Sequence, residues 1–368
     1  MGKQDYNKNF GDSRFMQHAL ELAKKATGKT SPNPLVGCVI VKDNKIIAEG
    51  FHNGPGSRHA ETDALSRIKK TEGAAMYVTL EPCCHTGKKT PPCTDAIIKS
   101  GIKKVIIGTL DPNPKVSGKG MEALRENGID VQLISDVDIV GQLIMLNESY
   151  NKFIRTNKPF VHIKSAITMD GKIATYSGES KWISNEAARR YAHELRNRYD
   201  AIMVSSNTVM KDNPSLTCRI PKGRDPVRII CDTAFKTEIK SNVYSDSNFI
   251  LATTKKADKE KLEQIRKKGK VIIVKKTSRG IDLKQLFTEL AASNITSILA
   301  EAGNKLALSL IQNNLADKVS YVIVPLLLGN DAKPALAELG INHIKDAIHL
   351  KNTSIKVMDN NVVIEGYL

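Results

Sequence analysis

Long hydrophobic runs are absent from this chain of 368 residues. The longest nearly unbroken apolar stretch covers 319–328, about half of the roughly 20 residues that a membrane-spanning helix requires. The first ten residues, MGKQDYNKNF, also lack the apolar core of a secretory signal peptide. We therefore expect a cytoplasmic protein without a membrane partner.

Aromatic residues are scarce, at 5% of the sequence with one tryptophan, although the net charge is +16. Proteins that bind single-stranded nucleic acid combine a dense basic groove with aromatic side chains. Here the excess charge is spread thinly, mostly as lysines in pairs such as Lys69-Lys70. We expect no nucleic-acid partner, although the positive charge can help to attract phosphorylated small molecules.

A glycine-rich dinucleotide fingerprint, G-x-G-x-x-G after a strand, is also missing. Cysteine is limited to six residues, but Cys83, Cys84 and Cys93 fall within eleven positions. In a chain without an export signal, such a cluster indicates metal or redox chemistry rather than a disulfide framework.

The length predicts two domains. Apolar strands alternate with amphipathic helices along the whole chain, which indicates layered α/β domains. In the first half the expected strands are 36–41, 46–49, 76–80, 105–110 and 131–134, and the longest expected helices are 13–27 and 139–154. Because Asn157-Lys158-Pro159 interrupts the last helix and the alternation then resumes, we place the domains at 1–156 and 157–368.

A zinc-dependent deaminase signature lies in the first domain. His59 and Glu61 form a His-x-Glu at the expected start of a helix, and Pro82-Cys83 follows a strand about twenty residues later. One imidazole and two thiolates can hold zinc while leaving a fourth position for water, whose pKa the metal lowers. Glu61, two residues from His59, would then be the carboxylate that moves protons.

These segments resemble the bifunctional deaminase–reductase family of riboflavin biosynthesis. The resemblance rests on SPNPLVGCVIV (31–41), HAE (59–61), TLEPCCHTGKKTPPC (79–93) and DPNPKVSGKG (111–120). It implies a cytidine-deaminase-like three-layer α/β/α domain that holds Zn²⁺ through His59, Cys83 and Cys93. It also implies that Asn33 and His85 line the pyrimidine pocket, whereas a turn asparagine and a loop histidine are the alternative interpretations.

The second zinc ligand remains open between two cysteines. Nucleic-acid deaminases usually place the two cysteines three residues apart, whereas this family usually separates them by nine. Cys93 lies nine residues after Cys84 and ten after Cys83. The Pro-Cys context favours Cys83, with one additional residue in the intervening loop.

The second half resembles the family's reductase domain, which is similar to dihydrofolate reductase and uses NADPH. KSAITMDGKIAT (164–175), SGESKWIS (177–184), the segment 193–219 and EAGNKLALSL (301–310) carry this resemblance. From the residues alone, Arg196 and Arg219 could converge on a phosphate or form surface ion pairs. Gly303, between a strand and a helix, would let a cofactor pyrophosphate approach backbone N–H groups.

The resemblance assigns two sets of residues in this half, one to each small molecule. The residues implied to contact the ribityl phosphate substrate are Lys164, Ser180, Ser184, Arg196, Leu216, Arg219 and Glu301. The residues implied to contact NADPH are Ala166, Trp182, Thr208, Asp212, Gly303 and Asn304. Helix capping by Ser184 and core packing of the Trp182 ring are the alternatives.

The sequence thus predicts one enzyme with two activities on small phosphorylated pyrimidines, a zinc-dependent deamination followed by an NADPH-dependent reduction, in a homo-oligomer formed through the reductase domain. A nucleic-acid base deaminase with an accessory binding domain is the alternative, which the basic charge supports and the cysteine spacing opposes. A zinc-stabilised binding protein without turnover is a third interpretation, but it leaves Glu61 without a task.

Overall fold

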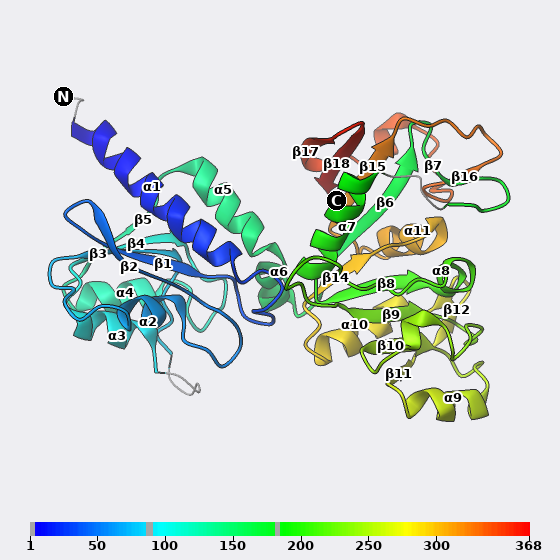
Figure 1. Ribbon diagram of the computed structural model, residues 1–368, viewed down its shortest axis with the longest axis horizontal. Coiled ribbons are helices and arrows are strands. Elements are labelled where there is room, and N and C mark those ends of the chain that lie inside the picture. The colour runs from blue at the N-terminus through cyan, green and yellow to red at the C-terminus, as the bar shows by residue number, and fades with distance from the viewer. Residues whose placement is uncertain (1–3, 86–90, 181–184) are drawn as a thin grey trace. The chain divides into compact units, whose positions relative to one another are not determined.

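The computed structural model describes residues 4–85, 91–180 and 185–368, with side chains from residue 11 onward. The chain forms two compact units, an N-terminal unit, Met1–Asn157, and a C-terminal unit, Lys158–Leu368 (Figure 1). None of the helices in these ranges combines the length and the apolar character that a bilayer crossing needs.

A five-stranded sheet forms the centre of the N-terminal unit. Its strand order is β2-β1-β3-β4-β5. The strands are β1 (Gly37–Lys42), β2 (Lys45–Phe51), β3 (Ala75–Leu80), β4 (Lys104–Thr109) and β5 (Asp130–Leu133). The pairs of β1 with β2 and with β3 are antiparallel, whereas β3, β4 and β5 run parallel. Their carboxyl ends therefore lie at one edge of the sheet.

Helices cover both faces of this sheet (Figure 1). Because successive strand residues point to opposite faces, Val39 and Val41 pack under α1 (Gln4–Lys24) and α5 (Val137–Leu146). Cys38 and Ile40 face α2 (Ala60–Leu65), α3 (Cys93–Ser100) and α4 (Lys119–Glu126). The predicted three-layer α/β/α architecture is confirmed.

Two helices replace the single one expected over 139–154. α5 ends before Asn147, and α6 (Glu148–Thr156) starts after it. The side chain of Asn147 accepts a hydrogen bond from the Leu35 backbone N–H at 2.8 Å and donates one to the Leu35 carbonyl at 2.9 Å. This contact lies 112 positions away along the chain, so helical periodicity could not reveal the break.

A nine-stranded sheet forms the centre of the C-terminal unit, in the order β11-β10-β9-β8-β14-β6-β15-β18-β17. The strands are β6 (Phe160–Thr168), β8 (Ala201–Ser205), β9 (Val227–Cys231), β10 (Phe249–Thr253), β11 (Lys270–Ile273), β14 (Ser297–Ala300), β15 (Lys318–Val324), β17 (Lys351–Met358) and β18 (Asn361–Tyr367). All neighbours from β11 to β15 are parallel, whereas β15, β18 and β17 pair antiparallel.

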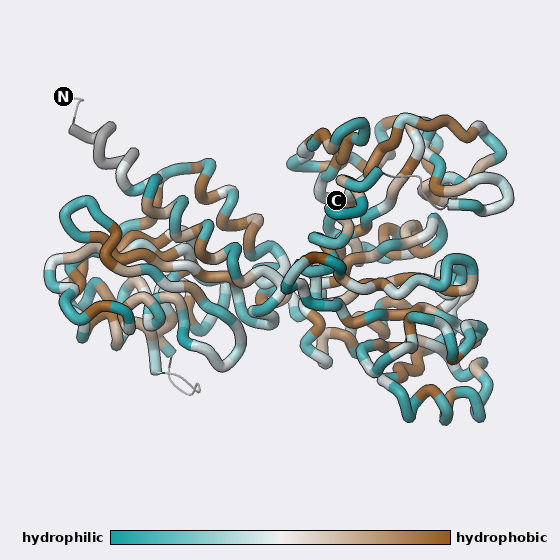
Figure 2. Tube along the Cα trace, viewed as in Figure 1, coloured by the Kyte–Doolittle hydropathy of each residue, from teal (hydrophilic) through white to brown (hydrophobic). Residues whose placement is uncertain are grey.

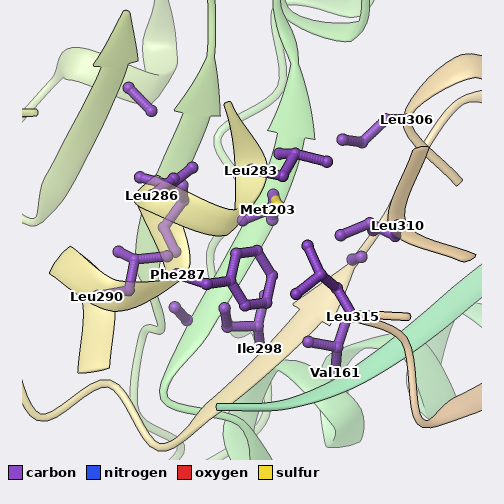
Figure 3. Close-up of a cluster of buried hydrophobic side chains, with 14 of the residues drawn as sticks. Val161, Met203, Leu283, Leu286, Phe287, Leu290, Ile298, Leu306, Leu310 and Leu315 are labelled. Carbon is purple, nitrogen blue, oxygen red and sulfur yellow. The ribbon is translucent and has the colours of Figure 1, made fainter. Parts of the chain in front are cut away.

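Two hydrophobic cores flank this sheet. On one face, Val161, Met203 and Ile298 pack against α10 (Leu283–Ala292) and α11 (Asn304–Gln312), with the Phe287 ring among these side chains (Figure 3). On the other, Ile202 and Leu299 pack against α7 (Glu186–Arg198) and α9 (Lys259–Arg266). In Figure 2 α9 alternates between hydrophilic and hydrophobic colours, which is typical of a helix with one buried face. The layered α/β architecture predicted for this half is confirmed.

Several elements of the C-terminal unit have no clear sequence signal. The short helix α8 (Ser206–Asp212) follows β8 directly and ends at Asn213, which has a left-handed backbone conformation. Two small two-stranded sheets pair β7 (Lys172–Ala174) with β16 (Lys333–Pro334) and β12 (Lys276–Thr277) with β13 (Gly280–Ile281). The edge strand β17 is exposed along most of its length, with Ile355 and Val357 68% and 73% exposed.

Candidate active sites

His59, Cys83 and Cys93 meet in the N-terminal unit. Their nitrogen and sulfur atoms all lie within 4.8 Å of one another. The His59 Nδ1 atom is 3.2 Å from Cys93 Sγ and 3.5 Å from Cys83 Sγ, and the Cys93 backbone N–H donates to Cys83 Sγ at 3.5 Å. Among the described residues, this is the one group of three or more such side chains that could hold a metal ion.

Three element ends bring these side chains together. His59 is the residue before α2, Cys83 follows the carboxyl end of β3, and Cys93 is the first residue of α3. Helix starts carry unpaired backbone N–H groups and favour negative charge, which suits thiolates.

Cys84 does not join this cluster. It is half-buried, whereas Cys83 and Cys93 are both buried, and burial raises the pKa of the Cys84 thiol. The structure thus places the cysteine with the longer spacing, Cys83, beside His59. The residues that could absorb the additional position, 86–90, lie outside the described part of the chain.

Glu61 lies in the first turn of α2 and is 3% exposed. Burial and the neighbouring Cys83 raise the pKa of its carboxyl to about 7. A hydrogen bond with Cys83, together with burial, also raises the pKa of the Cys93 thiol. Both shifts have the same origin, which is that several acidic groups are buried close to one another.

The donor set fits zinc. One imidazole and two thiol sulfurs are the atoms that catalytic zinc sites use, with bonds of about 2.0–2.3 Å. Donor atoms 3.2 to 3.5 Å apart can reach such an ion together. A divalent cation would also balance the charge that otherwise raises the pKa of Glu61 and Cys93.

Asn33 contacts His52, which in turn contacts His59 of this cluster and was not predicted from the sequence. The Asn33 side-chain amide is 3.1 Å from His52 Nε2, and the His52 and His59 rings meet edge to face with centroids 5.4 Å apart. Burial lowers the pKa of His52. His85, the other predicted pocket residue, is half-buried directly before 86–90. His52 directly follows β2, and it belongs to no motif by which the sequence would single it out.

A charged cluster in the C-terminal unit gathers four of the predicted substrate residues. The Arg196 guanidinium on α7 donates to both carboxylate oxygens of Glu301, at 3.1 and 2.9 Å, and to the Thr217 carbonyl at 3.2 Å. Lys164 on β6 faces this pair; burial lowers the pKa of its ammonium, while Glu301 acts to raise it. Arg219 and Arg196 both lower the pKa of His193, after the larger effect of burial.

A cavity of about 730 Å³ in the same unit gathers most of the predicted cofactor residues. Thr208 and Asp212 on α8 line it, as do Gly303 and Asn304 at the start of α11. Ser180, predicted as a substrate contact, lines the same cavity. A Cβ on Gly303 would meet nothing within 4 Å, so the cavity is open at this glycine.

The remaining predicted residues do not line this cavity or are not described. Ala166 lies on β6 opposite Val322 of β15 and packs at the edge of a hydrophobic core. Leu216 is buried with a positive φ of 55°, an unusual conformation for leucine. Trp182 and Ser184 lie outside the described residues.

Comparison with known proteins relates each unit to a known domain. The family model described as "RibD C-terminal domain" matches residues 159–364. The model described as "Cytidine and deoxycytidylate deaminase zinc-binding region" matches residues 11–109. The cluster of His59, Cys83 and Cys93 lies wholly inside the latter region, and the residues that line the large cavity lie inside the former.

Curated relatives match along nearly the whole chain. The riboflavin biosynthesis protein RibD of Actinobacillus pleuropneumoniae is 41% identical over 364 residues, which cover 97% of this chain and 96% of the relative. RibD of Escherichia coli is 37% identical over 368 residues, 96% and 98% of the two chains.

Solved structures agree with these relatives. Acinetobacter baumannii RibD superposes with a TM-score of 0.86 and 32% identity over 98% of this chain and 99% of that one. A diaminohydroxyphosphoribosylaminopyrimidine deaminase/5-amino-6-(5-phosphoribosylamino)uracil reductase from Thermotoga maritima superposes with a TM-score of 0.84 and 36% identity, again over 98% and 99%.

Proposed function

The chain belongs to the RibD family of bifunctional deaminase–reductases of riboflavin biosynthesis, and we propose that each of its two domains catalyses one of the two reactions. Residues 1–156 hydrolyse the 2-amino group of 2,5-diamino-6-ribosylamino-4(3H)-pyrimidinone 5′-phosphate and release ammonia. Residues 157–368 reduce the ribose portion of the resulting 5-amino-6-(5-phosphoribosylamino)uracil to its ribitylamino form with NADPH. The observation that carries the first half is the convergence of one imidazole and two thiols beside a buried carboxylate.

In the deaminase half, His59, Cys83 and Cys93 hold zinc. When bound, the ion supplies activation of water near neutral pH. Glu61, which forms a hydrogen bond with Cys93, accepts the proton that the attacking water loses. It delivers this proton to the ring nitrogen, then takes the second proton from the hydroxyl added to the ring carbon and passes it to the amine, so that a carbonyl forms and ammonia leaves as a neutral molecule. Asn33, held by His52, and His85 orient the pyrimidine ring.

In the reductase half, the charged cluster binds the substrate and the cavity binds the cofactor. Lys164, Arg196, Arg219 and Glu301 bind the ribosyl phosphate, with Ser180, Ser184 and Leu216. Guanidinium groups suit phosphate because their planar donors form paired hydrogen bonds. The bidentate hydrogen bonds from Arg196 to Glu301 also hold the Arg196 guanidinium in one orientation.

The cavity takes the nicotinamide cofactor, which we propose is NADPH. Gly303 and Asn304 start α11, where backbone N–H groups favour a pyrophosphate. Thr208 and Asp212 line the same cavity from α8, and Ala166 and Trp182 complete the set. The protein's task in this step is to place the hydride donor against C1′ of the open-chain ribosylamine.

We also propose that the protein acts in the cytoplasm as a homo-oligomer formed through the reductase half. The exposed edge strand β17 supports this, because its free side offers unpaired backbone groups and the apolar Ile355 and Val357 to a second copy. Light scattering of the purified chain tests it. Ile355→Lys should yield a smaller particle than the unmodified chain, and an unmodified chain that is monomeric at all concentrations would contradict it.

The decisive experiment separates the two activities in one protein. Glu61→Gln should lower ammonia release about 100- to 10,000-fold, the range for loss of a general acid–base, while NADPH oxidation on pre-deaminated substrate stays unchanged. Glu122→Gln, at an exposed glutamate of α4, is the matched control. Equal loss of both activities in a folded Glu61→Gln protein would contradict the division of work.

The alternative of a nucleic-acid base deaminase is not favoured, because the relatives match along the whole chain and not in a deaminase domain alone. A gel-shift assay across salt concentrations checks this conclusion. Binding carried by phosphate contacts would fall steeply with salt, and we expect no shift at physiological ionic strength.

A further inference from the structure

Glu81 is a buried carboxylate to which the proposed mechanism gives no task. It stands two residues before Cys83, directly after β3, and is 3% exposed. Its two oxygens accept four backbone hydrogen bonds, from Asp111 at 3.2 Å, Gly118 at 2.9 Å, Gly120 at 2.9 Å and Met121 at 3.1 Å. An ionised carboxylate accepts without donating, so this side chain suits four converging N–H groups.

These four donors come from one segment, the 111–121 loop, which joins the end of β4 to the first turn of α4. The loop is pressed closely against the residues before Cys83. A Cβ on Gly120 would collide with the Pro82 carbonyl oxygen and lie 3.1 Å from Glu81 Oε1. At the other end of the loop, Asp111 accepts a hydrogen bond from the Tyr150 hydroxyl at 3.0 Å.

The same loop also contacts the proposed zinc ligands. Val116, at its middle, is buried and packs with Cys83 and Cys93 in a small hydrophobic cluster of three residues. Its side chain therefore packs on the two sulfur-bearing residues. The carboxylate of Glu81 thus holds the 111–121 loop in place, and the same loop contacts Cys83 and Cys93 through Val116.

We propose that Glu81 is a positioning residue of the metal centre, which holds the 111–121 loop so that Val116 keeps Cys83 and Cys93 at ligand distance. This inference rests on the proposed deaminase function. The proposed role depends on the reach of the Glu81 side chain and not on its charge, because each of its two oxygens must reach two N–H groups at once.

Two substitutions separate reach from charge. Glu81→Gln keeps the length but turns an –NH₂ donor toward two backbone N–H groups, and Glu81→Asp keeps the charge but is one methylene shorter. Both should lower zinc affinity, measured against a chromophoric chelator, and the kcat of ammonia release by about 10- to 100-fold, the range for groups that orient metal ligands. The visible spectrum of the Co²⁺-substituted protein should change in both, which a loss of stability alone would not cause.

A matched control isolates the metal centre from general stability. Asp136 caps α5 by accepting from two backbone N–H groups, at 3.1 Å each, and it belongs to the same unit without contacting the cluster. Asp136→Asn should lower the melting temperature but leave zinc affinity and the Co²⁺ spectrum unchanged. Val116→Ala, which keeps every Glu81 hydrogen bond, should weaken zinc binding in the same direction as the Glu81 substitutions.

Three results would overturn the inference. The first is a Glu81→Gln protein that melts lower but binds zinc and turns over as the unmodified chain does. The second is normal zinc affinity in Glu81→Asp, which would leave charge as the only requirement. The third is unchanged zinc affinity in Val116→Ala. Failure of the unmodified chain to bind zinc would instead contradict the proposed function. The thermal melting curve of each variant reports whether the N-terminal unit has folded, and reductase activity reports the same for the C-terminal unit.

Discussion

The two units build their sites in opposite ways. In the N-terminal unit, three donor atoms and one carboxylate lie together in a buried cluster, at the starts of two helices and the end of one strand. In the C-terminal unit, the corresponding residues spread over a charged cluster and a cavity of about 730 Å³. A small ion needs few donors at short range, whereas a dinucleotide needs a long, open surface.

This difference predicts how each site responds to a single substitution. Removing one donor from a set of three leaves a metal site incomplete. Removing one contact from an extended cofactor surface changes one part of a large binding area. Substitutions in the N-terminal unit should therefore have the larger effects on activity, and those in the C-terminal unit should be graded.

The largest effect is expected at Cys83. Cys83→Ser should lower ammonia release by more than about 100-fold, because changes to groups around the ligands alone cost about 10- to 100-fold. Cys84→Ser is the control, since Cys84 stands outside the cluster. Zinc content by atomic absorption and ammonia release check both variants. A Cys84→Ser protein that loses zinc while Cys83→Ser keeps it would reverse the assignment.

Next in size is the loss of the ion pair in the charged cluster. Arg196→Met removes the partner of Glu301, whose side chain is 19% exposed. We expect the C-terminal unit to lose about 3 kcal/mol of stability, as when one partner of a buried pair is removed, and the KM for the phosphorylated substrate to rise. Arg190→Met, at a largely exposed ion pair on the same helix, should change stability by less than about 1 kcal/mol. Urea denaturation and steady-state reductase kinetics measure both.

Third is a pH dependence of the stability of the C-terminal unit. His162 is buried between the Tyr199 hydroxyl, at 2.8 Å, and the Ser320 hydroxyl, at 2.5 Å. Burial, with a smaller effect of Lys318, lowers the pKa of His162 to about 3. Between pH 6.5 and 3 the unfolded chain therefore takes up a proton that the folded one does not, and stability falls as the pH falls, by up to about 1.4 kcal/mol per pH unit.

The variant His162→Gln tests this dependence, because an amide does not titrate. Between pH 7 and 5.5 its urea-unfolding free energy should vary less with pH than that of the unmodified chain. Glu365 titrates lower: although burial acts to raise its pKa, Lys318 lowers it to about 2, so its contribution is lost only below about pH 4.5. Equal slopes in the two proteins above pH 5.5 would exclude His162 as the source.

The smallest effect is expected at Gly303. Its φ of −66° and the open space around it allow alanine, so Gly303→Ala should change stability by less than about 1 kcal/mol. The added methyl should raise the KM for NADPH and leave the KM for the ribosylamine unchanged. Gly141→Ala, in open space on α5, is the control and should change neither of the two KM values. An unchanged KM for NADPH in Gly303→Ala would remove Gly303 from the cofactor surface.

The architecture was largely predictable because its elements carry local signals. Apolar stretches of strand length predicted β1, β3, β4 and β5 within one residue at each end. The edge strand β17 carries a weaker signal, since it is exposed on most of its residues. The break at Asn147 was missed because it depends on a contact with Leu35, which no local pattern records.

The zinc donors were recognisable because His59 and Glu61 stand at the start of one element, and Pro82-Cys83 follows the next element along the chain at a characteristic spacing. His52 and Glu81 were not singled out. Each acts through partners that are distant in sequence, Asn33 for the one and the 111–121 loop for the other.

The sequence by itself determined the kinds of chemistry in this protein, because residue types fix which atoms can bind a metal, move a proton or attract a phosphate. Only the tertiary structure decided which of two adjacent cysteines lies beside His59 and which polar groups hold one another in place. Such choices depend on how strand ends and helix starts meet in space, and side chains one residue apart after a strand point in different directions.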